Sequence, residues 1–216
     1  MSTTSRLISY GSSVLYGSEL PDGSLSMSAI IAQKLGLDYL CRAKPVSSNT
    51  KIAKKIISYQ DYQDDFVLVM WTAPNRYEFK SENGWRGFTT FNHRDALLTE
   101  WFNGPGGLEY TEVMTALQAM CLTQQFLVSR AIPYLFITDY STIKESYTFN
   151  SNDEYIVAMK SLIDWNRFIY FDGDGFIPWA TKNKFTFVGS HPGAEAHQAA
   201  TNILINPTVS ILTNKI

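Results

Sequence analysis

The segment Phe66–Trp71 (FVLVMW) is an unbroken apolar run, and it restricts the fold more than any other feature of this sequence. A strand whose side chains do not alternate between polar and apolar is buried on both faces, which is typical of a parallel sheet covered by helices. Pro133–Thr138 (PYLFIT) is nearly as apolar. Because parallel strands need crossover connections, which are usually helical, these runs predict an α/β fold.

The rest of the chain supplies the other elements of this alternating pattern. Further short strands are predicted at 6–10, 38–43 and 185–188, and the tail 206–216 is apolar and β-branched enough to predict one more. Apolar residues at helical spacing predict helices at 28–35, 48–60, 110–130, 153–162 and 194–204. We therefore predict a flavodoxin-like three-layer α/β/α sandwich with a central, mostly parallel, five-stranded sheet.

The length of 216 residues suits one domain with a large core. We expect residues 1–216 to form that single domain. Residues 72–108 interrupt the alternation, because they are rich in Gly, Pro and Asn and also contain Trp85 and Trp101. Such a long irregular stretch inside a compact domain is uncommon unless it has a function. We interpret 72–108 as an insertion or lid.

Charge and hydropathy exclude several classes of protein. The net charge is −2 and no basic stripe is present, so no nucleic-acid partner is expected. The sequence has neither a membrane span nor a signal-peptide core, which predicts a soluble protein made in the cytoplasm. Cys41 and Cys121 are too few and too distant to indicate a disulfide framework. His191 and His197 lack a third ligand at a metal-site spacing, so we expect no metal and no other cofactor.

Residues that directly follow the predicted strands form the candidate site, because ligands bind at the carboxyl ends of parallel strands. Ser13 follows the first strand and His191 follows the last, and an imidazole near a serine hydroxyl can make it a nucleophile. Two purely structural roles are the alternatives: Ser13 as a helix N-cap, and Arg76 as the partner of Glu78. Polar side chains also follow the second and third strands: Ser48, Asn49, Thr72, Asn75 and Arg76.

Four segments, in order along the chain, resemble the sequence blocks of the SGNH, or GDSL-type, hydrolases, and in particular their phage and bacterial branch. They are YGSSVLYGSEL (10–20), AKPVSSNTKI (43–52), VLVMWTAPNRYEF (67–79) and SHPGAEAHQAA (190–200). The resemblance implies an α/β sandwich in which a Ser–His–Asp set hydrolyses esters, often acetyl groups on carbohydrates. It implies Ser13 as the nucleophile and His191 as the base. It implies donors to the oxyanion or substrate among Ser48, Asn49, Thr72, Asn75 and Arg76.

The chain departs from that family pattern in its supporting groups. No acid precedes His191, because Val188 and Gly189 stand where the family has Asp. Val46 replaces the glycine of the oxyanion hole, and Ser12 replaces the Asp before the nucleophile. Without an acid, nothing in the sequence orients the imidazole or stabilises its charged form. Asp172 and Asp174 are the candidates for a substitute acid.

Two functions of different classes follow. The first is a serine esterase or carbohydrate deacylase that acts on an acylated carbohydrate through Ser13 and His191, weakened by the missing groups. The second is a catalytically degenerate SGNH-fold structural or binding protein of a larger assembly, such as a phage virion, which contacts its protein partners through residues 72–108 and the C-terminal tail. A Ser13–His191 contact with an acceptor on the far ring nitrogen favours the enzyme, whereas a closed pocket favours the assembly protein.

Overall fold

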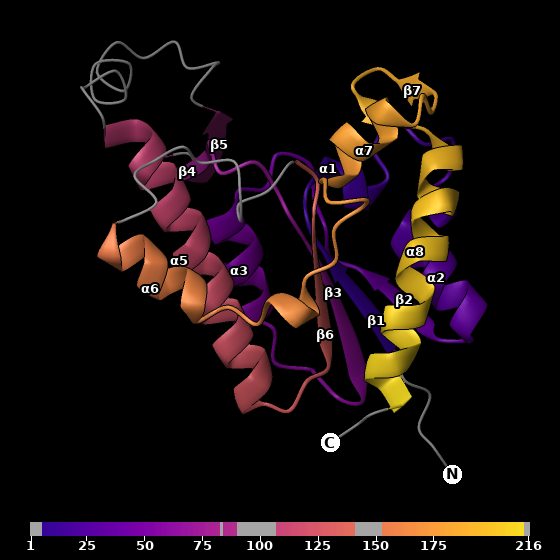
Figure 1. Cartoon of the computed structure of the whole chain (residues 1–216), viewed down its shortest axis with the longest axis horizontal. Helices are drawn as coiled ribbons and strands as arrows, with labels where there is room; N and C mark the ends of the chain where they lie inside the picture. Colours follow the sequence, from indigo (N-terminus) through magenta and orange to yellow (C-terminus); the bar gives the residue numbers. More distant parts are fainter. Residues whose placement is uncertain (1–5, 83, 90–106, 141–152, 214–216) are drawn as a thin grey trace.

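A four-stranded parallel sheet forms the centre of the computed structural model, which describes residues 6–82, 84–89, 107–140 and 153–213 (Figure 1). The strand order is β2-β1-β3-β6, with each neighbouring pair parallel. The strands are β1 (Arg6–Tyr10), β2 (Asp38–Cys41), β3 (Asp65–Trp71) and β6 (Tyr134–Thr138). Strand β3 is buried at every residue, as its apolar run predicts.

Helices cover both faces of this sheet, which confirms the predicted three-layer sandwich (Figure 1). On one face lie α3 (Asn49–Ile57), α5 (Gly107–Ser129) and α6 (Glu154–Ser161). On the other lie α2 (Met27–Leu35), α7 (Phe176–Lys182) and α8 (Ala194–Thr213). No helix in the described ranges is long and apolar enough to cross a bilayer.

The sheet differs from the prediction at its outer edge. Four strands are paired in the described residues instead of five, and Phe168 adds only a single parallel bridge to Phe136 of β6. The predicted strand at 185–188 is reduced to β7 (Phe187–Val188), which pairs antiparallel with β8 (His191–Pro192) away from the sheet. The two-residue connection between β7 and β8 favours this local hairpin over a long-range parallel pairing.

Helix α8 corrects the prediction that the chain after Asn206 forms a strand. The helix continues to Thr213 and contains Pro207. Ala200, Leu204 and Thr208 recur every fourth residue on its buried face, so helical packing continues past the proline. The one backbone hydrogen bond that Pro207 removes is offset by this packing.

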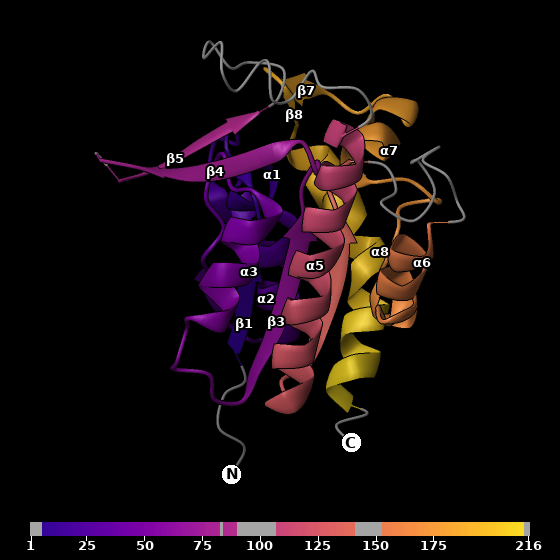
Figure 2. The same ribbon diagram turned by 90° about the vertical axis from the view of Figure 1, so that its left-hand side faces the viewer.

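The predicted insertion begins with an antiparallel hairpin of β4 (Arg76–Ser81) and β5 (Gly84–Thr89). Figure 2 shows this hairpin at the end of the sheet that carries the short helix α1 (Ser13–Tyr16). Trp101 and His93 lie outside the described residues, so the interpretation of 72–108 as a lid stays a prediction.

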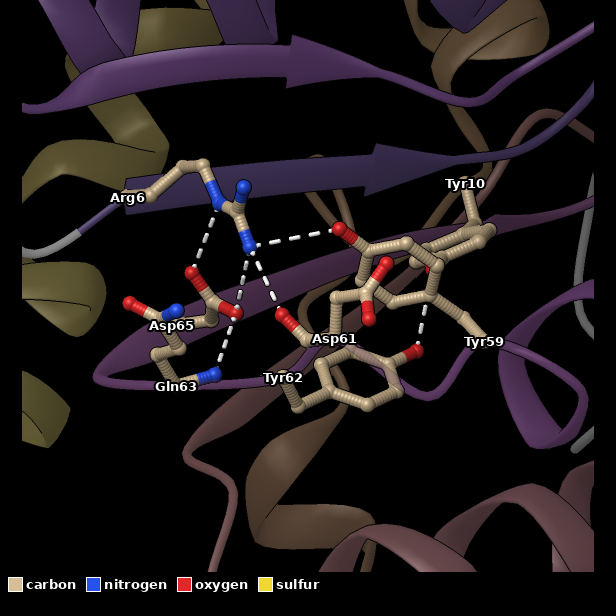
Figure 3. Close-up of polar contacts among 7 residues, drawn as sticks. All are labelled: Arg6, Tyr10, Tyr59, Asp61, Tyr62, Gln63 and Asp65. Carbon is tan, nitrogen blue, oxygen red and sulfur yellow. Dashed lines mark hydrogen bonds and ion pairs between the residues drawn. The ribbon is translucent and has the colours of Figure 1, made fainter.

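The opposite end of the sheet is joined by an ion pair between two neighbouring strands (Figure 3). Arg6 of β1 and Asp65 of β3 are register partners. The guanidinium donates to both carboxylate oxygens, at 2.9 and 3.0 Å, and the Gln63 main-chain N–H donates to Asp65 at 2.9 Å. The Asp65 side chain is only 2% exposed, whereas that of Arg6 is 30% exposed. The pair therefore aligns β1 with β3 around a buried negative charge.

Candidate active site

Ser13 lies where the chain turns sharply from β1 into α1. Gly11 allows this turn, because a Cβ there would lie 3.2 Å from the Met70 carbonyl oxygen and 3.1 Å from the Leu15 Cβ. Ser12 occupies the N-cap position and Ser13 is the first residue of the helix. The simple N-cap interpretation of Ser13 is therefore wrong, since the cap position belongs to its neighbour.

His191 reaches Ser13 from the other end of the chain. It lies in β8, and its Nε2 is 2.7 Å from the Ser13 Oγ. The structure therefore brings together the two side chains that the sequence singled out, at the carboxyl end of the sheet. Their catalytic roles remain predictions at this point.

The far nitrogen of the same ring also has a partner, Glu19. The Glu19 Oε2 lies 2.8 Å from the His191 Nδ1 and accepts a hydrogen bond from the Ser190 main-chain N–H at 3.2 Å. This contact with His191 lowers the pKa of the Glu19 carboxyl. A carboxylate therefore does lie on the imidazole, contrary to the expectation that none is available.

Neither substitute acid suggested by the sequence contacts His191 in the described structure. Asp172 accepts a hydrogen bond from the Trp179 Nε1 at 2.9 Å, and Asp174 closes a tight backbone bridge with Phe171. The sequence did contain a signal for Glu19, because this residue belongs to the same block as Ser13, YGSSVLYGSEL. The family pattern places the acid just before the histidine, so this pattern does not single out Glu19.

Asp139, one of the residues that directly follow a predicted strand, lies buried beside the turn from β1 into α1. It follows β6 and accepts a hydrogen bond from the Ser12 Oγ at 2.9 Å. Burial raises the pKa of this carboxyl, and the nearby positive charge of Arg76 and the Ser12 hydrogen bond oppose the rise. The residue before Ser13 thus joins the end of β1 to the end of β6.

Three of the predicted donor residues are buried and form contacts within the protein. Ser48 caps α3, because its Oγ accepts from the Lys51 main-chain N–H at 3.1 Å. The Asn49 side chain donates to the Thr72 carbonyl and accepts from the Thr72 N–H, both at 2.9 Å. The bonds of Asn49 tie the start of α3 to the end of β3.

The other two predicted donors begin the β4–β5 hairpin. Asn75 and Arg76 are half-buried there. Glu78 forms an ion pair with Lys51 at 2.8 Å, which corrects the alternative in which Arg76 and Glu78 hold each other. Arg76 instead acts electrostatically on the buried Asp139. Substrate binding by Asn75 and Arg76 stays a prediction.

Val46 has a backbone conformation that is typical of glycine. Its φ angle is +56°, in the left-handed region that a β-branched residue rarely adopts. The same loop is tied to the turn from β1 into α1 by a hydrogen bond from the Lys44 N–H to the Gly11 carbonyl, at 3.1 Å. A rare backbone conformation of this kind persists only where the surrounding structure imposes it.

His197, the other histidine of the last block, is buried within the fold. Its Nδ1 accepts a hydrogen bond from the Met27 main-chain N–H at 3.2 Å, and its ring packs 4.9 Å from that of Phe176. Burial, together with the nearby charge of His191, lowers the pKa of His197 to about 4. Among the described residues, no group of three or more His, Cys, Asp or Glu side chains is arranged to hold a metal ion.

Replacing His197 by asparagine should flatten the pH dependence of stability. Between pH 6.5 and about 4 the unfolded chain binds a proton that the folded His197 does not, so stability decreases as the pH falls, by about 1.4 kcal/mol per unit at most. Asparagine keeps an acceptor for Met27 but does not titrate. Urea unfolding of both proteins from pH 4.5 to 7 measures the difference. Identical slopes would contradict a buried, neutral His197.

No known family and no curated protein matches this chain by sequence. Solved structures do match it in fold. A carbohydrate esterase family 2 enzyme from Corynascus thermopiles (Myceliophthora fergusii) superposes with a TM-score of 0.59 at 13% identity, over 99% of this chain and 68% of that one. The acetyl xylan esterase Est2A from Butyrivibrio proteoclasticus gives 0.55 at 13% identity, over 99% and 65%.

A two-domain esterase active on acetylated mannans also matches, with a TM-score of 0.55 at 10% identity, over 98% of this chain and 51% of that one. The chain therefore spans about half to two thirds of the length of these proteins. The chain shares the α/β fold of these carbohydrate esterases, in agreement with the fold that the four sequence blocks predict.

Proposed function

We propose that this chain hydrolyses esters by nucleophilic catalysis, with Ser13 as the nucleophile and His191 as the general base. The observation that carries the proposal is the 2.7 Å separation of the Ser13 Oγ and the His191 Nε2. At that distance the hydroxyl can pass its proton to the ring as it attacks a carbonyl carbon. The position of both residues at the carboxyl end of a parallel sheet also supports it.

The reaction proceeds in two similar halves. Ser13 Oγ attacks the ester carbonyl while the His191 Nε2 takes its proton, and the resulting imidazolium then protonates the departing alcohol. A water molecule, deprotonated by the same nitrogen, attacks the acyl-serine, and the ring then returns the proton to the Ser13 Oγ as the acid is released. The main-chain N–H of Ser13 opens α1, where N–H groups have no partner within the helix, and is one donor for the oxyanion.

We assign an acylated carbohydrate as the class of substrate. The support is the shared fold with esterases whose descriptions name acetyl xylan and acetylated mannans. A hollow of about 490 Å³ borders Glu19 and is lined in part by the aromatic rings of Tyr16 and Tyr39. Aromatic side chains beside Glu19, the residue that contacts His191, suit a sugar ring as the group attached to the ester.

The alternative, a degenerate structural protein of a virion, is not favoured by any observation on the described residues. His191 has a partner on each ring nitrogen, which matches the arrangement expected of the enzyme. Residues 206–213 of the tail that was predicted to form a strand are instead the end of α8, which packs on α2.

A fluorophosphonate probe tests the proposal, because it reacts only with an activated serine. We expect the wild-type chain to be labelled at Ser13 and to release acetate from an acetylated xylo-oligosaccharide. Ser13→Ala should lose both, whereas Ser18→Ala, which changes another serine of the same segment, should keep both. A folded wild-type protein that is neither labelled nor active on p-nitrophenyl acetate would overturn the proposed function.

A further inference from the structure

We infer that Glu19 is the positioning acid for His191, supplied by the turn that follows the nucleophile helix instead of by the segment before the histidine. This inference rests on the proposed function. It replaces the acid that is missing at Val188 and Gly189 with one from the segment that carries Ser13. It also makes a single short segment, Ser13 to Glu19, the source of both the nucleophile and the acid.

The contacts form a continuous chain across the imidazole. The Ser13 Oγ lies 2.7 Å from Nε2, and the Glu19 Oε2 lies 2.8 Å from Nδ1. An ionised carboxylate can only accept hydrogen bonds, so the ring hydrogen is placed on Nδ1. The lone pair of Nε2 then faces the hydroxyl of Ser13, as a general base requires. His191 also makes the pKa of the Glu19 carboxyl lower than usual, so the acid stays charged.

The backbone conformations of Glu19 and of the facing residue Gly189 position this carboxylate and leave space for it. Glu19 itself has a φ of +68°, a left-handed conformation that favours glycine and that aims its side chain back toward β8. Gly189 has a φ of +57°, and a Cβ at that position would lie 2.7 Å from both Glu19 carboxylate oxygens. The next residue, Ser190, donates its main-chain N–H to Oε2 at 3.2 Å. Glycine at 189 thus leaves the space in which the carboxylate lies.

A structural ion pair is the competing interpretation, and the exposure of Glu19 argues against it. The Glu19 side chain is 38% exposed, and exposed ion pairs contribute little to stability. Glu19 and Gly189 both have positive φ angles, and a structural ion pair does not require these backbone conformations. The other carboxylates near the site have different partners, because Asp139 binds Ser12 and Asp172 binds Trp179.

The test compares Glu19→Gln with Asp22→Asn, which removes the same charge from the same loop. We expect Glu19→Gln to lower kcat on p-nitrophenyl acetate by about 10²- to 10⁴-fold with little change in KM or Tm, because the glutamine amide no longer fixes the ring hydrogen. Asp22→Asn, whose carboxylate contacts only Ser24 among the described bonds, should keep wild-type kcat.

A third variant changes the space around the acid instead of the acid itself. Gly189→Ala, which keeps the acid but occupies its space, should lower kcat in the same direction as Glu19→Gln. If both variants keep wild-type kcat while Ser13→Ala is inactive, the inference fails and the proposed function stands.

A titration that does not depend on activity separates failure of this inference from failure of the proposed function. In the wild-type chain the ¹³C signal of the Glu19 carboxyl should titrate below the usual range for glutamate, and in His191→Asn its pKa should rise toward the usual value. This result supports the contact even in a protein without esterase activity. An unchanged titration in His191→Asn overturns the role of Glu19 whatever the activity of the wild-type chain.

Discussion

Replacing His191 by asparagine should lower kcat/KM for ester hydrolysis by about 10⁴-fold or more and leave the protein folded. The Ser13 hydroxyl is a weak nucleophile by itself, and the imidazole is the group within 2.7 Å that can accept its proton. Asparagine cannot act as a base at neutral pH. Steady-state kinetics on p-nitrophenyl acetate, with circular dichroism as the check on folding, measures the effect.

His197→Asn is the matched control, since it makes the same change in the same segment. His197 is buried and bonded to the Met27 N–H, and none of the described hydrogen bonds joins it to Ser13, so this variant should alter stability and keep kcat/KM within about threefold. The assignment of the base is wrong if His191→Asn keeps more than a tenth of the wild-type kcat/KM. It is also wrong if the two variants lose activity equally.

Replacing Arg6 by methionine should lower the free energy of unfolding by about 3 kcal/mol. The change leaves the Asp65 carboxylate, 2% exposed, without its counter-charge, and an uncompensated buried charge is among the most destabilising defects in a protein. Urea unfolding at pH 7 measures the loss. The Gln63 N–H still donates to Asp65, but one neutral donor does not replace a guanidinium.

Replacing Asp65 instead of Arg6 should lower the free energy of unfolding by a smaller amount. Asp65→Asn leaves Arg6, whose side chain is 30% exposed and keeps the Tyr59 hydroxyl and the Asp61 carbonyl as partners. The double variant, Arg6→Met with Asp65→Asn, should be more stable than Arg6→Met alone, because its buried group is neutral. Equal losses for the two single variants would contradict a role for burial of Asp65.

The sequence by itself determined the layers of this protein. Apolar runs such as Phe66–Trp71 identify buried strands, and the spacing of Ile52 and Ile56 identifies a helix face, because both patterns depend only on local geometry. Ser48 as the cap of α3 and Gly36 as the end of α2 were predictable for the same reason. The sequence paired Ser13 with His191 because both follow predicted strands, and the two side chains do meet, although the strand before His191 forms a separate hairpin instead of joining the sheet.

Only the tertiary structure decided which groups support that pair. Glu19 and His191 are separated by 172 positions, and no local pattern encodes a contact that depends on two turns meeting in space. The same holds for the Ser12–Asp139 bond, and for α8, where packing against α2 overrides the β-branched residues after Pro207. Local periodicity specifies elements, but the partner of a single side chain depends on how distant loops fold over the rim of the sheet.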